Sequence, residues 1–286
     1  MIVDVNTKLV ALLGYPLGHS LSPAMHNPVF EKLGLNYFYL PIEVKDDDLR
    51  DVAIAIAKMN FAGYNITIPH KIRIMEYLDR IDELAQLIGA VNVVSIKDGV
   101  TTGYNTDGAG FIRSLQAETG ISVEGTSVFL VGCGGAARSI AMTLAFKHAE
   151  EIYLCNRTER KAHDLAREIN NKVKPCSKVV PMDTHEMKAA LSQAQVLINT
   201  TSVGMHPKEG EIPLAAECLH EDLIVCDIVY NPLKTELLKT AEGLGCKTVS
   251  GIGMLVYQGA EAFKLWTGVE PLIDVMFEAV SAGKRA

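Results

Sequence analysis

Apolar and polar positions alternate with two different periods along the first hundred residues. Short apolar runs are typical of buried strands, and the stretches between them have the spacing of amphipathic helices. In chain order these segments are 8–13, 22–33, 37–42, 47–59, 63–67 and 71–77. The alternation predicts a mostly parallel α/β sheet. The pair Ser22-Pro23 predicts a helix that Ser22 caps and Pro23 opens, which places the preceding loop 14–21 where open α/β sheets bind ligands.

A second unit begins near Asp107. A predicted helix at 108–117 leads to the apolar run 127–131, which meets the glycine-rich turn 132–137 and then the apolar-periodic stretch 140–146. A strand, a glycine turn and a helix in this order start a Rossmann unit. Further predicted strands, separated by helices, follow at 151–155, 196–199 and 223–227.

The C-terminal part of the chain is predicted to be helical. Residues 251–266 end the sheet pattern, so the last helices should return to the first domain. The 286 residues exceed the roughly 250 at which single cores tend to split. We therefore predict a two-domain α/β protein. Its substrate-binding catalytic domain is 1–107 completed by 252–286, its Rossmann-type nucleotide domain is 108–251, and the reaction is expected in a cleft between them.

The composition excludes several classes of protein. A net charge of −7 argues against nucleic acid as a partner, because an acidic surface repels phosphate. No run approaches the ~18 uncharged apolar residues of a membrane helix, and the N-terminus lacks a secretion signal, so we expect a cytoplasmic protein. The six cysteines stand singly and are expected to be small buried hydrophobes. The eight histidines form no HExxH motif, and we predict no metal site.

The turn after the run 127–131 has the features of a dinucleotide site. Gly132 permits a tight turn, Gly134 lets the backbone approach a pyrophosphate, and Ala137 leaves room for helix and strand to pack closely. The N-terminus of the following helix faces the anion. The predicted site also includes the intervening Gly135 and Ala136.

The residues at the end of the next strand indicate which dinucleotide binds. About 20 residues after the glycine turn, an acidic side chain would accept a hydrogen bond from the free 2′-hydroxyl of NAD. This sequence has Asn156-Arg157-Thr158 there instead, followed by Lys161. An arginine with a hydroxyl neighbour and a nearby lysine suits a 2′-phosphate. The sequence therefore favours NADP over NAD.

Short polar side chains gather in the first domain at the predicted ends of strands. Alternation within the strand places Asn65 and Thr67 on one face. Such a concentration of hydrogen-bonding groups suits a polyhydroxylated substrate; the residues concerned are Ser20, Ser22, Asn65, Thr67, Lys71, Asn92 and Asp107.

These segments closely resemble the shikimate dehydrogenase family, including its quinate/shikimate branch. The resemblance covers nearly the whole chain, and several motifs in the family's order are far more specific than any one alone. They are HSLSP at 19–23, NITIPHK at 65–71, GAVN at 89–92, GYNTDG at 103–108, GCGGAAR at 132–138, NRT at 156–158, NTTSVGM at 199–205, VYNP at 229–232 and GMLVYQGAEAF at 253–263.

The resemblance implies an NADP-dependent enzyme of aromatic amino acid biosynthesis, in the chorismate pathway, that interconverts 3-dehydroshikimate and shikimate. It implies that Lys71 and Asp107 are the catalytic pair. The substrate-binding residues it implies are Ser20, Ser22, Asn65, Thr67, Asn92, Tyr230 and Gln258. On the nicotinamide side it implies Thr200, Ser202, Val203, Gly204 and Met205, with Ile228, Gly251 and Met254 nearby.

The chemistry also gives a reason for the lysine. Hydride addition to a ketone leaves negative charge on oxygen, which a protonated donor within about 3 Å must neutralise. Lys71 can donate that proton, and Asp107 would orient the ammonium. His19, His26 and His70 have suggestive neighbours, but they are expected to be surface or loop-stabilising residues.

Three alternatives stay open at this point. The nearest is a broader quinate/shikimate dehydrogenase that uses both NAD and NADP. A nucleotide-binding sensor without chemistry would not need both Lys71 and Asp107. A Rossmann enzyme acting on an imine or a folate carbon would not need the hydroxyl and amide array. The sequence gives no preference between a monomer and a homodimer.

Overall fold

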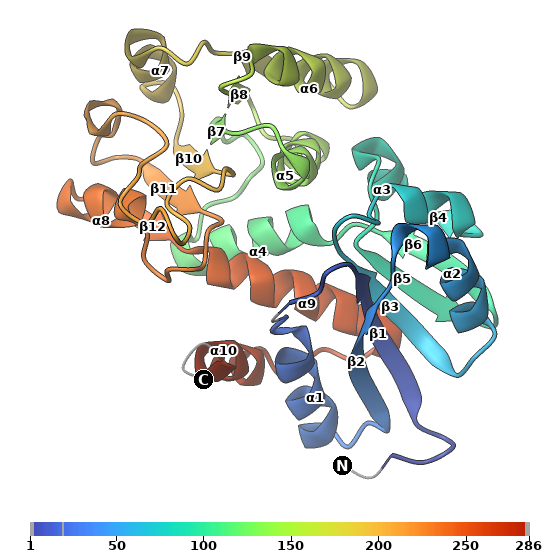
Figure 1. The fold of residues 1–286 in the computed structure, drawn as a ribbon. Coiled ribbons are helices and arrows are strands. Elements are labelled where there is room, and N and C mark those ends of the chain that lie inside the picture. Colours follow the sequence, from blue (N-terminus) through green and yellow to red (C-terminus); the bar gives the residue numbers. More distant parts are fainter. Residues whose placement is uncertain (1–2, 19, 284–286) are drawn as a thin grey trace. The chain divides into compact units, whose positions relative to one another are not determined.

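The computed structural model describes residues 3–18 and 20–283. Their contacts divide the chain into two compact units, residues 1–106 with 256–286, and residues 107–255. Each unit is built on its own sheet (Figure 1). The α/β fold class predicted from the sequence is confirmed.

The sheet of the first unit has the strand order β2-β1-β3-β5-β6-β4. Strands β2, β1 and β3 run parallel, whereas β5 is antiparallel to both β3 and β6. The strands are β1 Lys8–Gly14, β2 Tyr37–Glu43, β3 Phe61–Ile66, β4 Arg80–Ile81, β5 Val93–Lys97 and β6 Val100–Tyr104. The helices are α1 Ser22–Lys32, α2 Leu49–Ala57, α3 Glu83–Ile88 and α10 Ile273–Gly283, with 3₁₀ turns at Asp46–Asp48 and Arg73–Tyr77.

Two local expectations differ from the structure. Within the segment 71–77, only Arg73–Tyr77 is helical, and it forms a 3₁₀ turn. Helix α1 begins at Ser22 itself, and no side chain caps it, so the expected capping role of Ser22 is wrong.

The sheet of the second unit has the order β12-β11-β10-β7-β8-β9, with all neighbouring strands parallel. Read from the other edge, this is the doubly wound order 3-2-1-4-5-6 of a Rossmann fold. The strands are β7 Val128–Val131, β8 Ile152–Cys155, β9 Ser177–Val179, β10 Val196–Asn199, β11 Ile224–Asp227 and β12 Lys247–Val249. The helices are α4 Asp107–Thr119, α5 Gly135–Phe146, α6 Glu159–Lys172, α7 Thr184–Leu191 and α8 Glu236–Gly243, with a 3₁₀ turn at Ala216–Cys218.

Apolar side chains explain why these strands form. Every residue of β7 and of β10 is buried, as expected for a parallel strand covered on both faces. One core cluster joins Phe129 of β7 to Leu191 of α7 and Leu238 of α8. The glycine-rich turn therefore follows a strand that is held rigidly in the middle of its sheet.

Helix α9, Gly251–Thr267, starts in the second unit, and its residues from Val256 onward belong to the first. There Trp266 packs on the sheet, where its Nε1 donates to the carbonyl of Val94 at 3.0 Å. A side chain at Gly63 would lie 2.5 Å from the Trp266 ring, so glycine is required there. Helix α10 packs on α1. The predicted return of the C-terminal helices to the first unit is thus confirmed.

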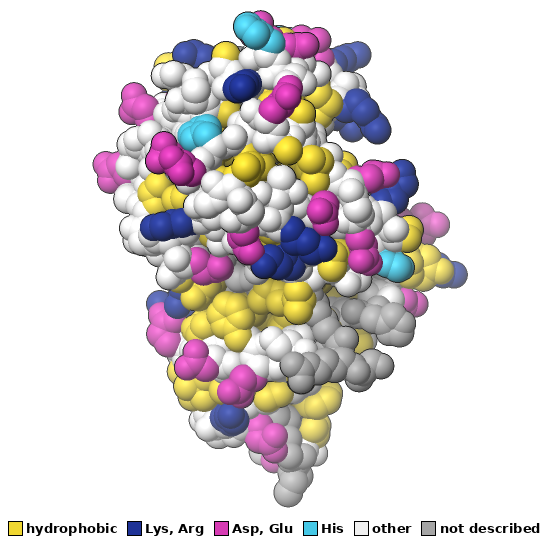
Figure 2. All heavy atoms as spheres, turned by 90° about the vertical axis from the view of Figure 1, so that its left-hand side faces the viewer, with side chains coloured by type: hydrophobic (Ala, Val, Ile, Leu, Met, Phe, Trp, Pro, Cys, Tyr) yellow, Lys and Arg dark blue, Asp and Glu magenta, His cyan; other side chains and the backbone are white. Residues whose placement is uncertain are grey.

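Charged side chains of both signs are mixed on the face drawn in Figure 2 over the described residues. Within those residues, no helix is both long and apolar enough to cross a bilayer. In the same part of the chain, no group of three His, Cys, Asp or Glu side chains is placed to hold a metal ion. The expected burial of the cysteines is wrong at one position. All six are free and five are buried, but Cys133 is partly exposed in the glycine-rich turn.

Candidate active site

The glycine-rich turn joins β7 to α5 in the second unit. Gly132 has a φ of +104°, and a Cβ there would lie 2.7 Å from the Thr200 hydroxyl, so a side chain is excluded on two grounds. Gly134 immediately precedes α5, and no atom lies within 4 Å of the position of its Cβ. The turn thus leaves open space at a helix N-terminus, which fits a pyrophosphate.

A cavity of about 700 Å³ adjoins this turn. Its volume is in the range of small-molecule sites. Its wall combines backbone from the glycine turn with two cations and several hydroxyls, and it contains predicted cofactor residues from three separate segments. The lining residues are Val131, Gly132, Cys133, Gly134, Asn156, Arg157, Lys161, Met182, Thr200, Thr201, Ser202, Val203, Glu211, Ile212 and Pro213.

Asn156 links the glycine turn to the cationic segment that follows β8. Its Oδ1 accepts from the Cys133 amide at 3.1 Å, and its Nδ2 donates to the Thr158 carbonyl at 2.8 Å. Arg157 and Lys161 are exposed and line the same cavity. The two cations therefore lie beside the turn that would hold a pyrophosphate, as a 2′-phosphate site requires.

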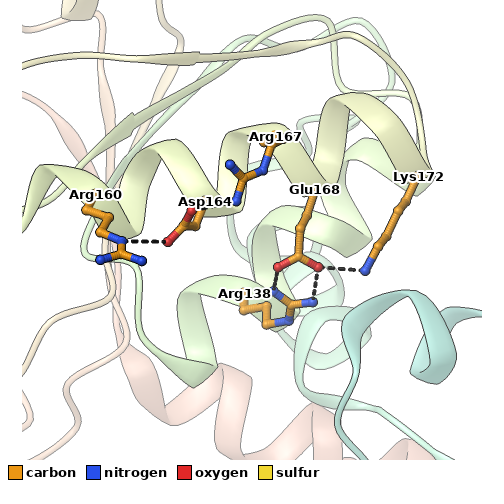
Figure 3. Close-up of polar contacts among 6 residues, drawn as sticks. All are labelled: Arg138, Arg160, Asp164, Arg167, Glu168 and Lys172. Carbon is orange, nitrogen blue, oxygen red and sulfur yellow. Dashed lines mark hydrogen bonds and ion pairs between the residues drawn. The ribbon is translucent and has the colours of Figure 1, made fainter.

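The ion pair between Arg138 of α5 and Glu168 of α6 ties the two helices together (Figure 3). The Arg138 guanidinium donates to both oxygens of Glu168 at 2.7 Å, and Lys172 donates to one of them. Arg138 is the main cause that lowers the pKa of Glu168 to about 2. Arg160 pairs instead with Asp164 along the exposed side of α6. The bidentate contact fixes the helix whose first turn carries Lys161.

The segment after β10 forms another wall of the cavity. Thr200 is buried, and its hydroxyl donates to the Val131 carbonyl at 2.8 Å. Gly204 has a φ of +87°, and Met205 is exposed beyond it. A Cβ at Gly251 would lie 2.2 Å from the Ile228 carbonyl oxygen, so these two predicted residues are in close contact.

Several predicted cofactor residues are not among those that line this cavity. Gly135 and Ala136 lie in the first turn of α5, Thr158 precedes α6, and Met254 is on α9. Gly204, Met205, Ile228 and Gly251 are also outside the lining. Tyr230, which was predicted to bind the substrate, is exposed in the segment after β11.

In the first unit, the structure brings three of the seven predicted substrate residues, Asn65, Asn92 and Gln258, into one network. Asn92 Oδ1 accepts from the Thr106 amide at 2.8 Å, and the Thr106 hydroxyl donates to the Gln258 carbonyl at 3.1 Å. Asn65 Nδ2 donates to the Asn92 carbonyl at 3.2 Å. Residues far apart in sequence thus form a single hydrogen-bonded cluster.

The loops after β1 and β3 approach this cluster. The Thr67 amide donates to the Leu13 carbonyl at 2.9 Å, and the Ser22 amide donates to the Ser20 hydroxyl at 3.2 Å. The carbonyl of Lys71 accepts from the Val91 amide at 2.8 Å, which ties the lysine turn to the segment that carries Asn92.

The predicted catalytic pair is divided between the two units. Lys71 belongs to the first, and Asp107 is the first residue of the second and of helix α4. Each has further interactions with its surroundings. Their pairing stays a prediction.

The histidines have structural roles where they are described. His70 is buried, and its Nε2 is 2.6 Å from the Val44 carbonyl, so it supports a loop as expected. His26 is a core residue, which corrects the expectation of a surface or loop position. His19 lies outside the described residues.

Comparisons with known proteins cover nearly the whole chain. A family model of the shikimate dehydrogenase substrate binding domain matches residues 12–94. A model of shikimate / quinate 5-dehydrogenase matches 114–228, and one of the shikimate 5'-dehydrogenase C-terminal domain matches 251–280. A shikimate dehydrogenase (NADP(+)) from Methanopyrus kandleri is 48% identical over 97% of this chain and 96% of its own.

The chain belongs to the shikimate dehydrogenase family.

Two solved structures extend the comparison to the fold of the family. Shikimate 5-dehydrogenase from Listeria monocytogenes, in complex with shikimate and NAD, is 40% identical with a TM-score of 0.94 over 97% of this chain and 98% of that one. Quinate dehydrogenase from Corynebacterium glutamicum, in complex with NAD, is 33% identical with a TM-score of 0.89 over 96% and 99%. The family resemblance seen in the sequence motifs is confirmed.

Sequence reasoning missed part of the cavity wall. Met182, Glu211, Ile212 and Pro213 line the cavity but belong to no motif. Met182 follows β9, a short strand that the apolar pattern did not predict. Only the sheet order, which places β9 next to β8, brings this residue to the site.

Proposed function

We propose that this chain catalyses the reversible NADP-dependent reduction of 3-dehydroshikimate to shikimate. Family membership and the cation-lined cavity support the proposal. The observation that carries it is the network in the first unit, where the Lys71 turn is hydrogen-bonded to the segment of Asn92. A proton donor thus accompanies amide and hydroxyl groups suited to a hydroxylated ring.

Bound NADPH would supply the hydride. Lys71 would donate a proton to the oxygen of the reacting ketone and accept one from the alcohol in the reverse direction. Asp107 would orient the lysine ammonium. Asn65, Asn92 and Gln258, with Ser20, Ser22, Thr67 and Tyr230, would hold the hydroxyls and carboxylate of the substrate.

Arg157 and Lys161 would select the cofactor. Both line the cavity beside the glycine turn, together with Asn156. A 2′-phosphate would form charge-assisted hydrogen bonds with these cations, and hydrogen bonds of this class contribute about 1.5–3 kcal/mol. We therefore expect kcat/KM to be about 10- to 100-fold higher with NADP+ than with NAD+. The remaining predicted cofactor contacts, from Thr200 to Met205 and at Ile228, Gly251 and Met254, belong to the same proposal.

The test is a matrix of two substrates against two cofactors. Shikimate and quinate are each oxidised with NADP+ and with NAD+, and kcat/KM is measured from the absorbance of the reduced nicotinamide. The proposal requires shikimate with NADP+ to give the highest value. No turnover with shikimate and either cofactor would refute the dehydrogenase assignment.

A second candidate function is a quinate/shikimate dehydrogenase with dual cofactor use. The likeness to the Corynebacterium glutamicum quinate dehydrogenase bound to NAD favours it. It requires comparable kcat/KM for quinate and shikimate, and a ratio between NADP+ and NAD+ close to one. The same matrix separates the two candidates.

We also propose a cytoplasmic location and a small-molecule substrate as the only obligatory partner. All six cysteines are free, as expected in a reducing compartment. Sedimentation of the purified protein would distinguish the monomer from the homodimer.

A further inference from the structure

Tyr39 lies on β2 with its ring in the core of the first unit. The residue is 1% exposed, and its ring stacks on His26 with centroids 4.8 Å apart and an interplanar angle of 15°. Its backbone is held as well, since the Tyr39 amide donates to Asn27 Oδ1 at 2.8 Å and Asn27 Nδ2 donates to the Tyr39 carbonyl at 3.0 Å. Because both the ring and the backbone of Tyr39 are held in place, its hydroxyl oxygen has a fixed position.

That hydroxyl contacts a residue of the proposed substrate site. It donates to Asn65 Oδ1 at 2.7 Å. Tyr39 therefore connects β2 to the Asn65 side chain of β3 through one buried oxygen.

The contact determines which end of the Asn65 amide faces the core. An amide carries an acceptor oxygen at one end and two N–H donors at the other. Tyr39 Oη occupies the oxygen, and the Asn92 carbonyl occupies one N–H at 3.2 Å. A reversed amide would place its oxygen against the Asn92 carbonyl and lose that bond, and the Tyr39 hydroxyl would have to turn its proton away in order to accept from the amide N–H. The second N–H stays available as a donor toward a substrate hydroxyl.

Burial also keeps the Tyr39 hydroxyl protonated, so that it can donate a hydrogen bond. Desolvation raises the pKa of Tyr39 well above its usual value, so the phenol carries its proton at any pH at which the enzyme would work. The Asn65 amide is therefore held in the same orientation throughout that range.

We propose that Tyr39 is a positioning residue for substrate recognition, which fixes Asn65 as a hydrogen-bond donor to a ring hydroxyl without touching the substrate itself. The inference rests on the proposed function. It adds a residue outside every motif that identified the family, on a strand whose sequence reads as ordinary core.

The adjacent Tyr64 provides a matched control. It precedes Asn65 on β3, so its side chain points to the opposite face of the sheet. Tyr64 is fully buried, and its hydroxyl has no hydrogen-bond partner among the described residues. Y39F and Y64F each remove one buried hydroxyl and keep the ring, but only Y39F removes a contact with Asn65.

The experiment measures KM for shikimate, KM for NADP+ and kcat for both variants. The loss of one neutral hydrogen bond to Asn65 should raise the KM for shikimate about 3- to 10-fold in Y39F. The KM for NADP+ should stay within about 2-fold, since the cofactor cavity lies in the other unit. Y64F should resemble the parent enzyme in all three constants.

A double-mutant cycle tests whether Tyr39 acts through Asn65. In an N65A background, Y39F should change kcat/KM for shikimate less than about 2-fold, because the group it positions is already absent. Equal effects of Y39F in both backgrounds would overturn the inference. So would a Y39F protein that fails to fold or that loses affinity for both ligands alike. If the parent enzyme did not oxidise shikimate at all, the proposed function itself would fail.

Discussion

His26 should make the first unit sensitive to acid, and H26F should remove that sensitivity. The ring is fully buried between Tyr39, Phe30, Phe263 and Trp266. Neither ring nitrogen has a hydrogen-bond partner among the described residues. Burial lowers the pKa of His26 from 6.5 to about 3. Between these two pKa values, the His26 imidazole is therefore neutral in the folded protein and charged in the unfolded chain.

The size of the effect follows from the pKa difference between the two states. Below pH 6.5 the unfolded chain binds a proton that the folded chain does not, so the free energy of unfolding falls as pH falls. The loss is about 1.4 kcal/mol per pH unit and continues until pH reaches the folded pKa near 3, for a total of about 5 kcal/mol. When the pH falls from 7.5 to 5, His26 alone should lower the free energy of unfolding by about 2 kcal/mol.

The chain contains one tryptophan, and it provides the assay. Trp266 contacts the His26 ring with centroids 5.4 Å apart, so its fluorescence reports unfolding of this unit. Urea denaturation at pH 7.5 and pH 5 gives the free energy of unfolding for the parent protein and H26F. The larger phenylalanine can cost packing energy, but that cost is the same at both pH values. The loss between the two pH values should therefore be about 2 kcal/mol smaller in H26F.

An exposed histidine supplies the control for this comparison. His185 on α7 has a side chain that is 90% exposed, and water surrounds it in both the folded and the unfolded chain. H185A should keep the pH dependence of the parent protein. Identical pH dependence in H26F and the parent would show that the buried ring is protonated in the folded state, and would refute the reasoning.

Three further predictions concern the cofactor-selecting Arg157, the catalytic Lys71 and the ion pair that joins α5 to α6. R157A should raise the KM for NADPH about 10-fold or more and leave the KM for NADH nearly unchanged; equal effects on both cofactors would exclude a role in phosphate binding. K71A should lower kcat by roughly 10²- to 10⁴-fold with a smaller change in the KM for shikimate, and retained turnover would eliminate the lysine as proton donor. E168Q should lower the free energy of unfolding by about 1–2 kcal/mol, because it breaks the bidentate contact with Arg138. D164N removes an exposed ion pair on the same helix and should lower the free energy of unfolding by less than about 0.5 kcal/mol. Thermal denaturation followed by circular dichroism measures both changes.

Periodicity predicted the longer parallel strands of both sheets, because these strands are largely apolar runs. It missed the parallel strands β4, β9 and β12, which have only two or three residues each. It also missed the antiparallel strands β5 and β6, in which apolar residues are mixed with polar ones: β5 begins with three buried residues and ends at the exposed Lys97, and buried and partly exposed residues alternate along β6. A local signal for this hairpin was present. Asp98 and Gly99 both have positive φ, the geometry that an Asp-Gly pair adopts in a two-residue hairpin turn. Turn chemistry would therefore have found what the hydrophobic pattern could not.

The predicted site residues divide by the kind of information that identifies them. Gly132 is determined locally, because its positive φ demands glycine, and Gly134 is identified by its position between an apolar run and a helix. The role of Arg157 could be predicted from the number of residues between it and that turn. Met182 depends on which strand lies next to β8, and no local pattern specifies that order.

The residues that support the site are harder to find than those that form it, for a physical reason. Asp227 is an example. It is buried at the end of β11, where its carboxylate accepts hydrogen bonds from Asn199, Thr235 and the Val229 amide. Burial raises the pKa of Asp227 while these three bonds lower it, so the charge is tolerable only because every partner is present. Such a group braces the segment after β10 that lines the cofactor cavity, yet its partners lie up to 28 positions away. Tyr39 and Asn65, which are 26 positions apart, follow the same rule in the first unit. In both units the side chain that a motif reveals has its orientation set by a buried partner that only the folded chain brings close.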